Sequence, residues 1–132
     1  MLKRALLASG IAVAATISFA PPASAAVTCS GRPATHVGTA ANNVINGTAG
    51  NDVIHGLGGA DRINGNGGHD IICGGEGGDI LDGGEGNDTL LGNKGNDQLR
   101  GGAGYGDDDF EGGPGNDWMI GGGDTSGHYG YD

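Results

Sequence analysis

The chain has 132 residues, of which 32 are glycine, and acidic residues outnumber basic ones by 16 to 6. That length allows one domain, and the formal net charge of −10 excludes nucleic acid and anionic membrane surfaces as natural partners and favours cations. Collagen is excluded because glycine does not recur at every third position. A disordered glycine-rich tract is the alternative that composition alone leaves open.

Residues 1–25 have the three parts of a secretory signal peptide. Lys3 and Arg4 give a positively charged start, an apolar stretch runs to Phe19, and residues 23–25 (Ala-Ser-Ala) form a small-residue cleavage site. We therefore expect Sec-type export, an extracellular location and a mature chain beginning at Ala26. A retained anchor is the alternative, but the apolar stretch is short for a membrane span. No later segment is apolar enough to cross a membrane, so no membrane insertion is expected.

Residues 26–37 form an N-terminal segment that contains Cys29, and the chain's other cysteine is Cys73. Disulfides persist in exported proteins, so one intrachain bridge is the first interpretation. An intermolecular bridge or two free thiols are the alternatives. Lipidation of Cys29 is disfavoured because Thr28 precedes it, and a zinc site is disfavoured because neither cysteine belongs to a C-x-x-C pair.

A nine-residue unit recurs from Gly38 onward, and we expect one repeat domain over residues 38–120. Position one is glycine in every copy, and position four is glycine in all but the first, which has Ala41. Position two is Gly or Asn in the later copies, but Thr39, Thr48 and Leu57 in the first three. Because Thr and Leu adopt a positive φ only at a cost, we expect better-formed turns from residue 65 onward.

Two further positions of the repeat carry its chemistry and its core. Position six is Asn43 in the first copy and acidic in all others: Asp52, Asp61, Asp70, Asp79, Asp88, Asp97, Asp108 and Asp117. Position eight is apolar throughout: Ile45, Ile54, Ile63, Ile72, Leu81, Leu90, Leu99, Phe110 and Met119. This strict register argues against disorder. A stretch with only its middle side chain buried predicts three-residue strands around a shared interior.

The register is interrupted once and then ends. Gly106 and Asp107 are inserted ahead of Asp108 and lengthen that turn. Residues 121–132 lack the repeat, and we expect this C-terminal tail to cap the stack, because solenoids need atypical terminal units.

The repeats should not fold without a cation. One buried aliphatic side chain per nine residues cannot offset the entropy of ordering a glycine-rich chain whose carboxylates repel one another. Calcium accepts six to eight oxygens in flexible geometry, including backbone carbonyls. Magnesium demands tighter octahedral geometry, and zinc suits an all-oxygen position six less well. We therefore expect several Ca²⁺ ions as cofactors.

The pattern G-G-x-G-x-D-x-U-x, with U a large apolar residue, is intact in residues 74–82 and 83–91. It resembles the calcium-binding nonapeptide repeats of the RTX (repeats-in-toxin, haemolysin-type) family. The resemblance extends over residues 38–120. It implies an all-β fold, a parallel β-roll, which is a right-handed β-solenoid with two repeats per coil and calcium between turns stacked on the same side.

Carried over by position, the resemblance implies that carbonyls of the glycine turns bind the ions together with the position-six carboxylates: Asp52, Asp61, Asp70, Asp79, Asp88, Asp97, Asp108 and Asp117. Asn43 departs from the pattern, and the insertion puts the site at Asp108 in question. Two repeats per coil would also place Val53, Ile71 and Leu91 on one outer face beside Cys73. We expect residues 26–37 to fold over this strip, held by a disulfide between Cys29 and Cys73.

These observations favour a secreted calcium-binding protein that is not an enzyme. The sequence has neither an H-E-x-x-H nor a G-x-S-x-G motif, and its four histidines are scattered. The alternative is a calcium-rigidified surface adhesion or interaction module. The sequence names no protein or carbohydrate partner for such a module.

Overall fold

The computed structural model describes residues 25–123, which form strands joined by turns and contain no helix. The predicted signal peptide and most of the predicted C-terminal tail lie outside the described residues. Within them, no helix is long and apolar enough to cross a membrane. The strands are β1 Thr28–Cys29, β2 Arg32–Pro33, β3 His36–Val37, β4 Val44–Asn46, β5 Val53–Gly58, β6 Arg62–Asn64, β7 Ile71–Glu76, β8 Ile80–Asp82, β9 Thr89–Lys94, β10 Gln98–Arg100, β11 Asp109–Glu111 and β12 Trp118–Ile120.

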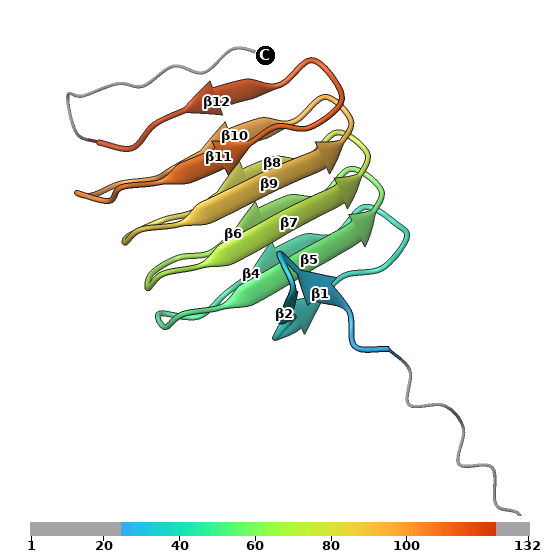
Figure 1. Ribbon diagram of the computed structural model, residues 1–132, viewed down its shortest axis with the longest axis horizontal. Coiled ribbons are helices and arrows are strands. Elements are labelled where there is room, and N and C mark those ends of the chain that lie inside the picture. The colour runs from blue at the N-terminus through green and yellow to red at the C-terminus, as the bar shows by residue number, and fades with distance from the viewer. Residues whose placement is uncertain (1–24, 124–132) are drawn as a thin grey trace, which may run out of the picture.

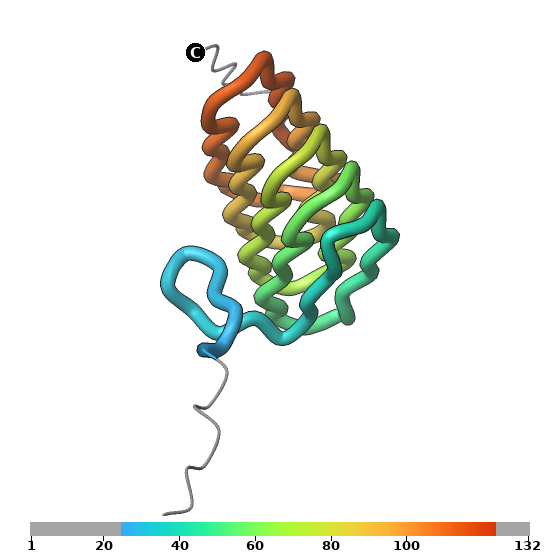
Figure 2. The backbone as a smooth tube through the Cα atoms, turned by 90° about the vertical axis from the view of Figure 1, so that its right-hand side faces the viewer, coloured from blue at the N-terminus to red at the C-terminus, as the bar shows by residue number. Residues whose placement is uncertain are grey.

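Strands alternate along the chain between two parallel sheets. One sheet has the order β11-β9-β7-β5-β3 and the other β12-β10-β8-β6-β4, so each sheet receives every second strand (Figure 1). Val53 pairs with Ile71 and Ile71 pairs with Thr89, a spacing of two nine-residue repeats. The successive coils stack into one solenoid (Figure 2). The predicted parallel β-roll with two repeats per coil is confirmed.

The core is a single file of position-eight side chains between the two sheets. Six are fully enclosed, and they are Ile54, Ile63, Ile72, Leu81, Leu90 and Leu99. Ile45, Phe110 and Met119 pack against this cluster from the two ends and are only partly buried, because a neighbouring coil covers just one side of each. Each enclosed aliphatic side chain contributes roughly 1.5–3 kcal/mol.

The strands of one sheet are longer than the predicted three residues. β5, β7 and β9 each have 6 residues, because pairing continues into the next turn, where Leu57 pairs with Gly75 and Gly75 with Asn93. On the opposite side of the roll, the turns within residues 25–123 share one isolated bridge, between Gly67 and Glu85. The turns that follow β5, β7 and β9 are therefore part of the ladder.

The N-terminal segment forms an antiparallel hairpin, β1–β2, on the outside of the roll (Figure 1). β1 contacts β5 and β7, and Cys29 is joined to Cys73 of β7 by a disulfide with the two Cα atoms 5.7 Å apart. Both cysteines are buried. The predicted intrachain disulfide and the predicted cover over this face are thus both present. The same segment also supplies β3, the first strand of the β3–β11 sheet.

Candidate metal centre

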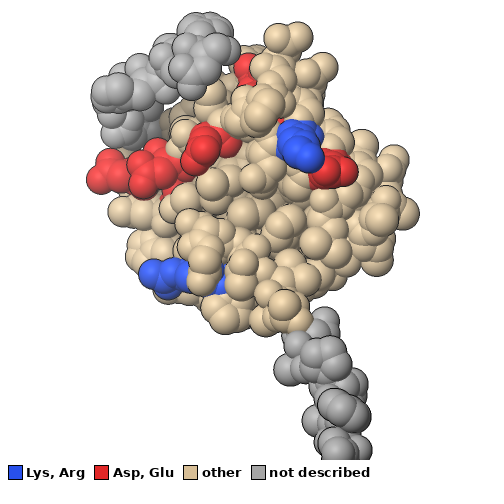
Figure 3. Space-filling model, turned by 45° about the vertical axis from the view of Figure 1, so that its right-hand side comes forward, with Lys and Arg blue, Asp and Glu red and all other residues tan. Residues whose placement is uncertain are grey.

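The position-six side chains form two columns, one on each side of the roll. One column lies just before strands β5, β7, β9 and β11 and consists of Asp52, Asp70, Asp88 and Asp108. The other lies just before strands β4, β6, β8, β10 and β12 and consists of Asn43, Asp61, Asp79, Asp97 and Asp117. The six from Asp52 to Asp97 are buried, while Asp108 and Asp117 are half-buried at the end of the stack. The acidic side chains that do reach the surface on the face in Figure 3 lie along one edge and beside a basic side chain.

From Asp61 onward, one oxygen of each position-six carboxylate accepts a backbone N–H from the coil before it. The backbone N–H of Asp52 donates to Asp70 Oδ1 at 2.8 Å, and that of Asp61 donates to Asp79 Oδ1 at 2.7 Å. The pattern continues through Asp88 and Asp97. It also includes Asp108 and Asp117, which accept from the coil before them at 3.0 and 2.9 Å. The two-residue insertion therefore leaves Asp108 in the column.

The second oxygen is buried without a hydrogen-bond donor in five of these aspartates. The atoms are the Oδ2 oxygens of Asp61, Asp70, Asp79, Asp88 and Asp97. A buried carboxylate oxygen without a donor is costly, and the cost is removed by a proton or by a cation. These five oxygens are the strongest structural sign of a ligand in the described part of the chain.

A second oxygen approaches each of these carboxylates at the position-one glycine. A Cβ on Gly56 would collide with Asp61 Oδ2 and with the carbonyl oxygen of Gly74, one coil further along. The same pair of oxygens, a carboxylate from the repeat and a carbonyl from the next coil, meets at Gly65, Gly74, Gly83 and Gly92. Position one is glycine because any side chain would fill the space that these oxygens share.

This donor set fits calcium. Carboxylate and carbonyl oxygens are the ligands that Ca²⁺ takes in flexible numbers. Within residues 25–123, His, Cys, Asp and Glu side chains do not gather in groups of three or more that could hold a metal ion. A metal ion bound here would therefore need backbone carbonyls of the turns in addition to side chains.

The turn shape changes after the second repeat. From Leu57 onward, positions two and four have positive φ in every copy, for example 83° at Leu57 and 96° at Gly59. Thr39 and Thr48 at position two, and Ala41 and Gly50 at position four, are not among the positive-φ residues. The predicted improvement of the turns is therefore present, but it begins at residue 56 rather than 65, because Leu57 accepts the left-handed conformation.

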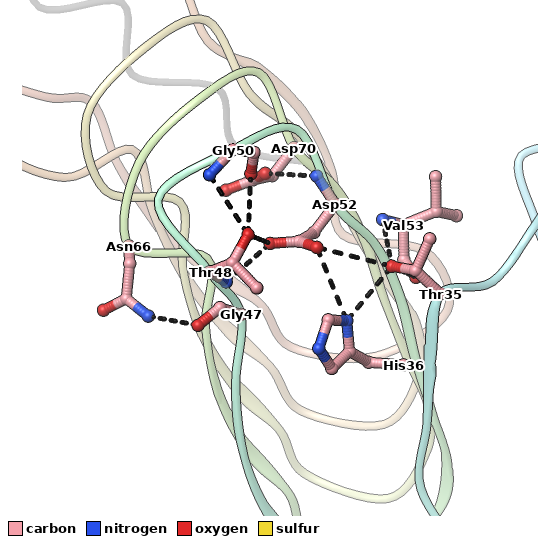
Figure 4. Close-up of polar contacts among 9 residues, drawn as sticks. All are labelled: Thr35, His36, Gly47, Thr48, Gly50, Asp52, Val53, Asn66 and Asp70. Atoms are coloured by element: carbon pink, nitrogen blue, oxygen red, sulfur yellow. Dashed lines mark hydrogen bonds and ion pairs between the residues drawn. The ribbon is translucent and has the colours of Figure 1, made fainter.

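In the first coil, residues 38–55, the protein's own donors surround the carboxylate. The backbone N–H and the hydroxyl of Thr48 donate to Asp52 Oδ2 at 2.6 and 2.9 Å. His36 Nδ1 lies 3.5 Å from Asp52 Oδ1, and the Asn66 amide donates to the carbonyl of Gly47 at 2.8 Å. Figure 4 shows Thr48 on one side of the Asp52 carboxylate and His36 on the other, with the Asn66 amide directed at Gly47. The Asp52 carboxylate is therefore satisfied within the chain.

The pKa values divide the aspartates in the same way. Burial raises the pKa of Asp70 and of Asp79 to about 6, although the backbone hydrogen bond from the preceding coil lowers it in part. Burial also raises the pKa of Asp61, Asp88 and Asp97. At Asp52 burial acts in the same direction, but the hydrogen bonds from Thr48 and the charge of His36 bring its pKa below the usual value.

Position five carries a second ladder that was not predicted. The Asn42 and Asn51 side-chain oxygens accept the backbone N–H of Ala60 and His69, each at 2.9 Å. His69 Nδ1 then accepts the N–H of Asn87 at 2.9 Å. The recurrence of Asn at position five was the available signal, at Asn42, Asn51, Asn87, Asn96 and Asn116. This ladder holds the peptide before Asp61, Asp70, Asp88, Asp108 and Asp117.

Comparison with known families agrees with the fold and with the oxygen-lined turns. The family model described as "RTX calcium-binding nonapeptide repeat (4 copies)" matches residues 37–72, 74–105 and 103–125. Neither a curated protein nor a solved structure matches the chain significantly. The matched residues include every strand of the roll from β4 to β12. The chain belongs to the RTX calcium-binding nonapeptide-repeat family.

Proposed function

We propose that this protein is secreted and binds calcium without catalysing a reaction, and that binding drives the roll to fold. The observation that carries the proposal is the set of five buried Oδ2 oxygens without donors, each beside a carbonyl of the next coil. The ligands would be Asp61, Asp70, Asp79, Asp88 and Asp97 with the carbonyls of their turns. Asp108 and Asp117 would contribute from the last coils, because both keep their places in the columns.

Coupling to folding follows from the electrostatics of the columns. Without a cation, the fold must bury neighbouring carboxylates that raise one another's pKa, as Asp52 and Asp88 do for Asp70. A cation that binds only the folded chain removes this penalty and stabilises the roll by mass action. The expected affinity is roughly 0.1–1 mM, the range of extracellular calcium modules.

A circular-dichroism titration tests this proposal. The mature chain with its disulfide intact is placed in calcium-free buffer, titrated with Ca²⁺ and then treated with chelator. We expect β-structure to appear with Ca²⁺ and to be lost with chelator, while Mg²⁺ at the same concentration produces little change. A spectrum that is the same before and after chelator would refute the proposal.

Secretion is supported by the buried disulfide, because such bonds persist outside the reducing cytosol. Mass spectrometry of the culture medium tests it directly. The expected species begins at Ala26 and carries a mass two hydrogens below that of the dithiol form. Recovery of the intact chain from the cell interior alone would contradict this part of the proposal.

One surface favours a second candidate function, a calcium-rigidified interaction module. The outer face of the β4–β12 sheet has no hairpin over it in the described residues, and a groove of about 340 Å³ there is lined by Val44, Ile80 and Trp118 among others. Trp118 is 56% exposed. Labelled wild-type protein and a Trp118→Ala variant can be compared for calcium-dependent retention on the producing cells. Equal retention of the two would speak against this second function.

A further inference from the structure

We infer that the first coil, residues 38–55, binds no calcium, because Thr39 and Thr48 hold its position-six side chains in place of a cation. The inference rests on the proposed calcium-binding function. It adds that the row of bound ions ends before the first coil. It changes the role assigned to Asp52, which the repeat pattern alone makes equivalent to the other aspartates.

The first step is the direction of the position-two N–H. In the first coil, the N–H of Thr48 donates to Asp52 Oδ2 of its own repeat. In a later repeat, the N–H of Gly84 donates instead to the carbonyl of Gly101 in the next coil at 2.9 Å, and Asp88 Oδ2 is left without a donor. The peptide at position two therefore decides whether the carboxylate oxygen is satisfied.

The second step is why that peptide turns. Gly84 has φ of 109°, a conformation that costs glycine nothing and costs a β-branched residue most. Thr48 avoids it, and Gly50 in the same turn does so as well, whereas the position-four glycines from Gly59 onward have positive φ. Threonine at position two thus selects a different turn, and its hydroxyl supplies a second donor to the same oxygen.

The third step concerns the carbonyl that would complete a site. At Gly47 the carbonyl of Gly65 lies beside Asp52 Oδ2, as the equivalent carbonyls do in the inner coils. Here, however, Asp52 Oδ2 already accepts the N–H and the hydroxyl of Thr48, and the carbonyl of Gly47 accepts the amide of Asn66. On the other side of the carboxylate, Thr35 Oγ1 and His36 Nδ1 both lie 3.5 Å from Asp52 Oδ1. A cation bound at Asp52 Oδ2 would have to displace the Thr48 donors, whereas at Asp79 Oδ2 it would displace none.

The fourth step concerns the first repeat, in which position six is the uncharged Asn43 instead of an aspartate. Asn43 Oδ1 accepts the N–H of Thr39 at 2.7 Å, and Asn43 Nδ2 donates to Thr39 Oγ1 at 3.1 Å. The same pair of positions, two and six, thus works with an amide that carries no charge. In both turns of the first coil, the position-two threonine hydrogen-bonds to the position-six side chain of its own repeat. Such a difference is expected of an atypical terminal unit in a solenoid.

The test compares two isosteric substitutions in the full mature chain, Asp52→Asn and Asp79→Asn. Bound calcium per chain is measured by equilibrium dialysis and atomic emission at saturating Ca²⁺, with circular dichroism to confirm that each variant is folded. We expect Asp52→Asn to bind as many ions as the wild type, since Asn43 shows that an amide suits this turn. We expect Asp79→Asn to bind at least one ion fewer.

Loss of as many ions from Asp52→Asn as from Asp79→Asn would overturn the inference while leaving the proposed function intact. A wild-type chain that binds no calcium would overturn both. Should Asp79→Asn fail to fold, Asp97→Asn supplies the same comparison from a coil nearer the C-terminal end, where Asp97 Oδ2 is also buried without a donor.

Discussion

The first coil, residues 38–55, and the inner coils, residues 56–100, share the same alternation of strands but differ in the electrostatics of position six. The first coil has Asn43 and Asp52 there, and the inner coils have aspartate in every repeat. Asp52 has a lowered pKa and donors around both oxygens. Asp79, in the same place in the repeat, has a pKa raised to about 6 and one oxygen without a donor. The position of an aspartate in the repeat therefore does not by itself determine its pKa and its hydrogen bonds. These depend also on the residue at position two of the same repeat.

The difference also explains why the inner coils contain so much glycine. Thr48 satisfies a carboxylate with its own N–H and hydroxyl, and its turn needs no positive φ. Gly75 supplies neither donor to Asp79 but reaches a φ of 120°. The inner turns thus leave their aspartates dependent on an external ligand, whereas the first coil is self-sufficient.

The largest expected effect is an inversion of the pH dependence when calcium is removed. In the calcium-free fold, the pKa of Asp70 and of Asp79 is about 6 instead of 3.8. Folding therefore favours their protonated form, and the stability present below pH 3.8 is lost as pH rises through 6. Calcium-free protein should gain β-structure between pH 7 and pH 5. Calcium-saturated protein should lose stability over the same interval, because protons compete with the cation.

Circular dichroism and thermal unfolding at pH 5, 6 and 7 measure both trends, with calcium removed by resin. The double variant Asp70→Asn/Asp79→Asn is the control, and it should show a much weaker pH dependence in calcium-free buffer. Asp52 acts in the opposite sense, because a lowered pKa means that its stabilisation is lost as pH falls below the ordinary value of 3.8. Parallel trends with and without calcium would contradict the assignment of the inner aspartates.

The second-largest expected effect is a difference in unfolding free energy between two alanine substitutions at position four, one in an inner turn and one in the first coil. Gly77 has φ of 126°, and a Cβ there would collide with the carbonyl of Gly59. Gly50 lacks positive φ, and its Cβ would meet only Thr48 Oγ1 at 3.7 Å. We expect Gly77→Ala to destabilise the calcium-bound protein by about 3 kcal/mol or more. Gly50→Ala should be neutral or slightly stabilising, as Ala41 at the same position indicates.

Chemical denaturation in saturating calcium measures the two changes in unfolding free energy. A similar loss in both variants would mean that the first-coil turn is as constrained as the inner ones. That result would remove the structural basis of the comparison.

The disulfide should stabilise the roll without affecting the number of ions. It joins Cys29 of the hairpin to Cys73, across a sequence separation of 44 residues. Closing a loop of this size is worth about 2–4 kcal/mol. The double variant Cys29→Ser/Cys73→Ser should therefore unfold at lower denaturant concentration, yet retain the wild-type calcium content at saturation. Loss of bound ions in the folded variant would show that the hairpin shapes the sites as well.

The strict register predicted short strands around one interior, the resemblance to the RTX repeats predicted the roll, and position eight located the core. Position six likewise placed Asp70, Asp79 and Asp88 correctly in two columns. The distinct state of Asp52 could not be read in this way, because it depends on His36, which precedes the repeats, and on the direction in which Thr48 of the same repeat turns its hydroxyl. The six-residue strands were missed for a similar reason. Their extension comes from pairing between stacked turns, which no single repeat encodes.

The smallest predicted effect tests the hydroxyl that distinguishes the first coil. Thr48→Ala removes the donor at 2.9 Å from Asp52 Oδ2 but keeps the backbone N–H at 2.6 Å. We expect a loss of about 1 kcal/mol in unfolding free energy, the usual value of one such hydrogen bond, with an unchanged calcium affinity. Thr89→Ala on β9 is the matched control, because Thr89 follows a position-six aspartate but its hydroxyl does not donate to the Oδ2 oxygen of Asp88 or of Asp70. A change in calcium affinity in Thr48→Ala alone would instead place Thr48 among the groups that shape the first ion site.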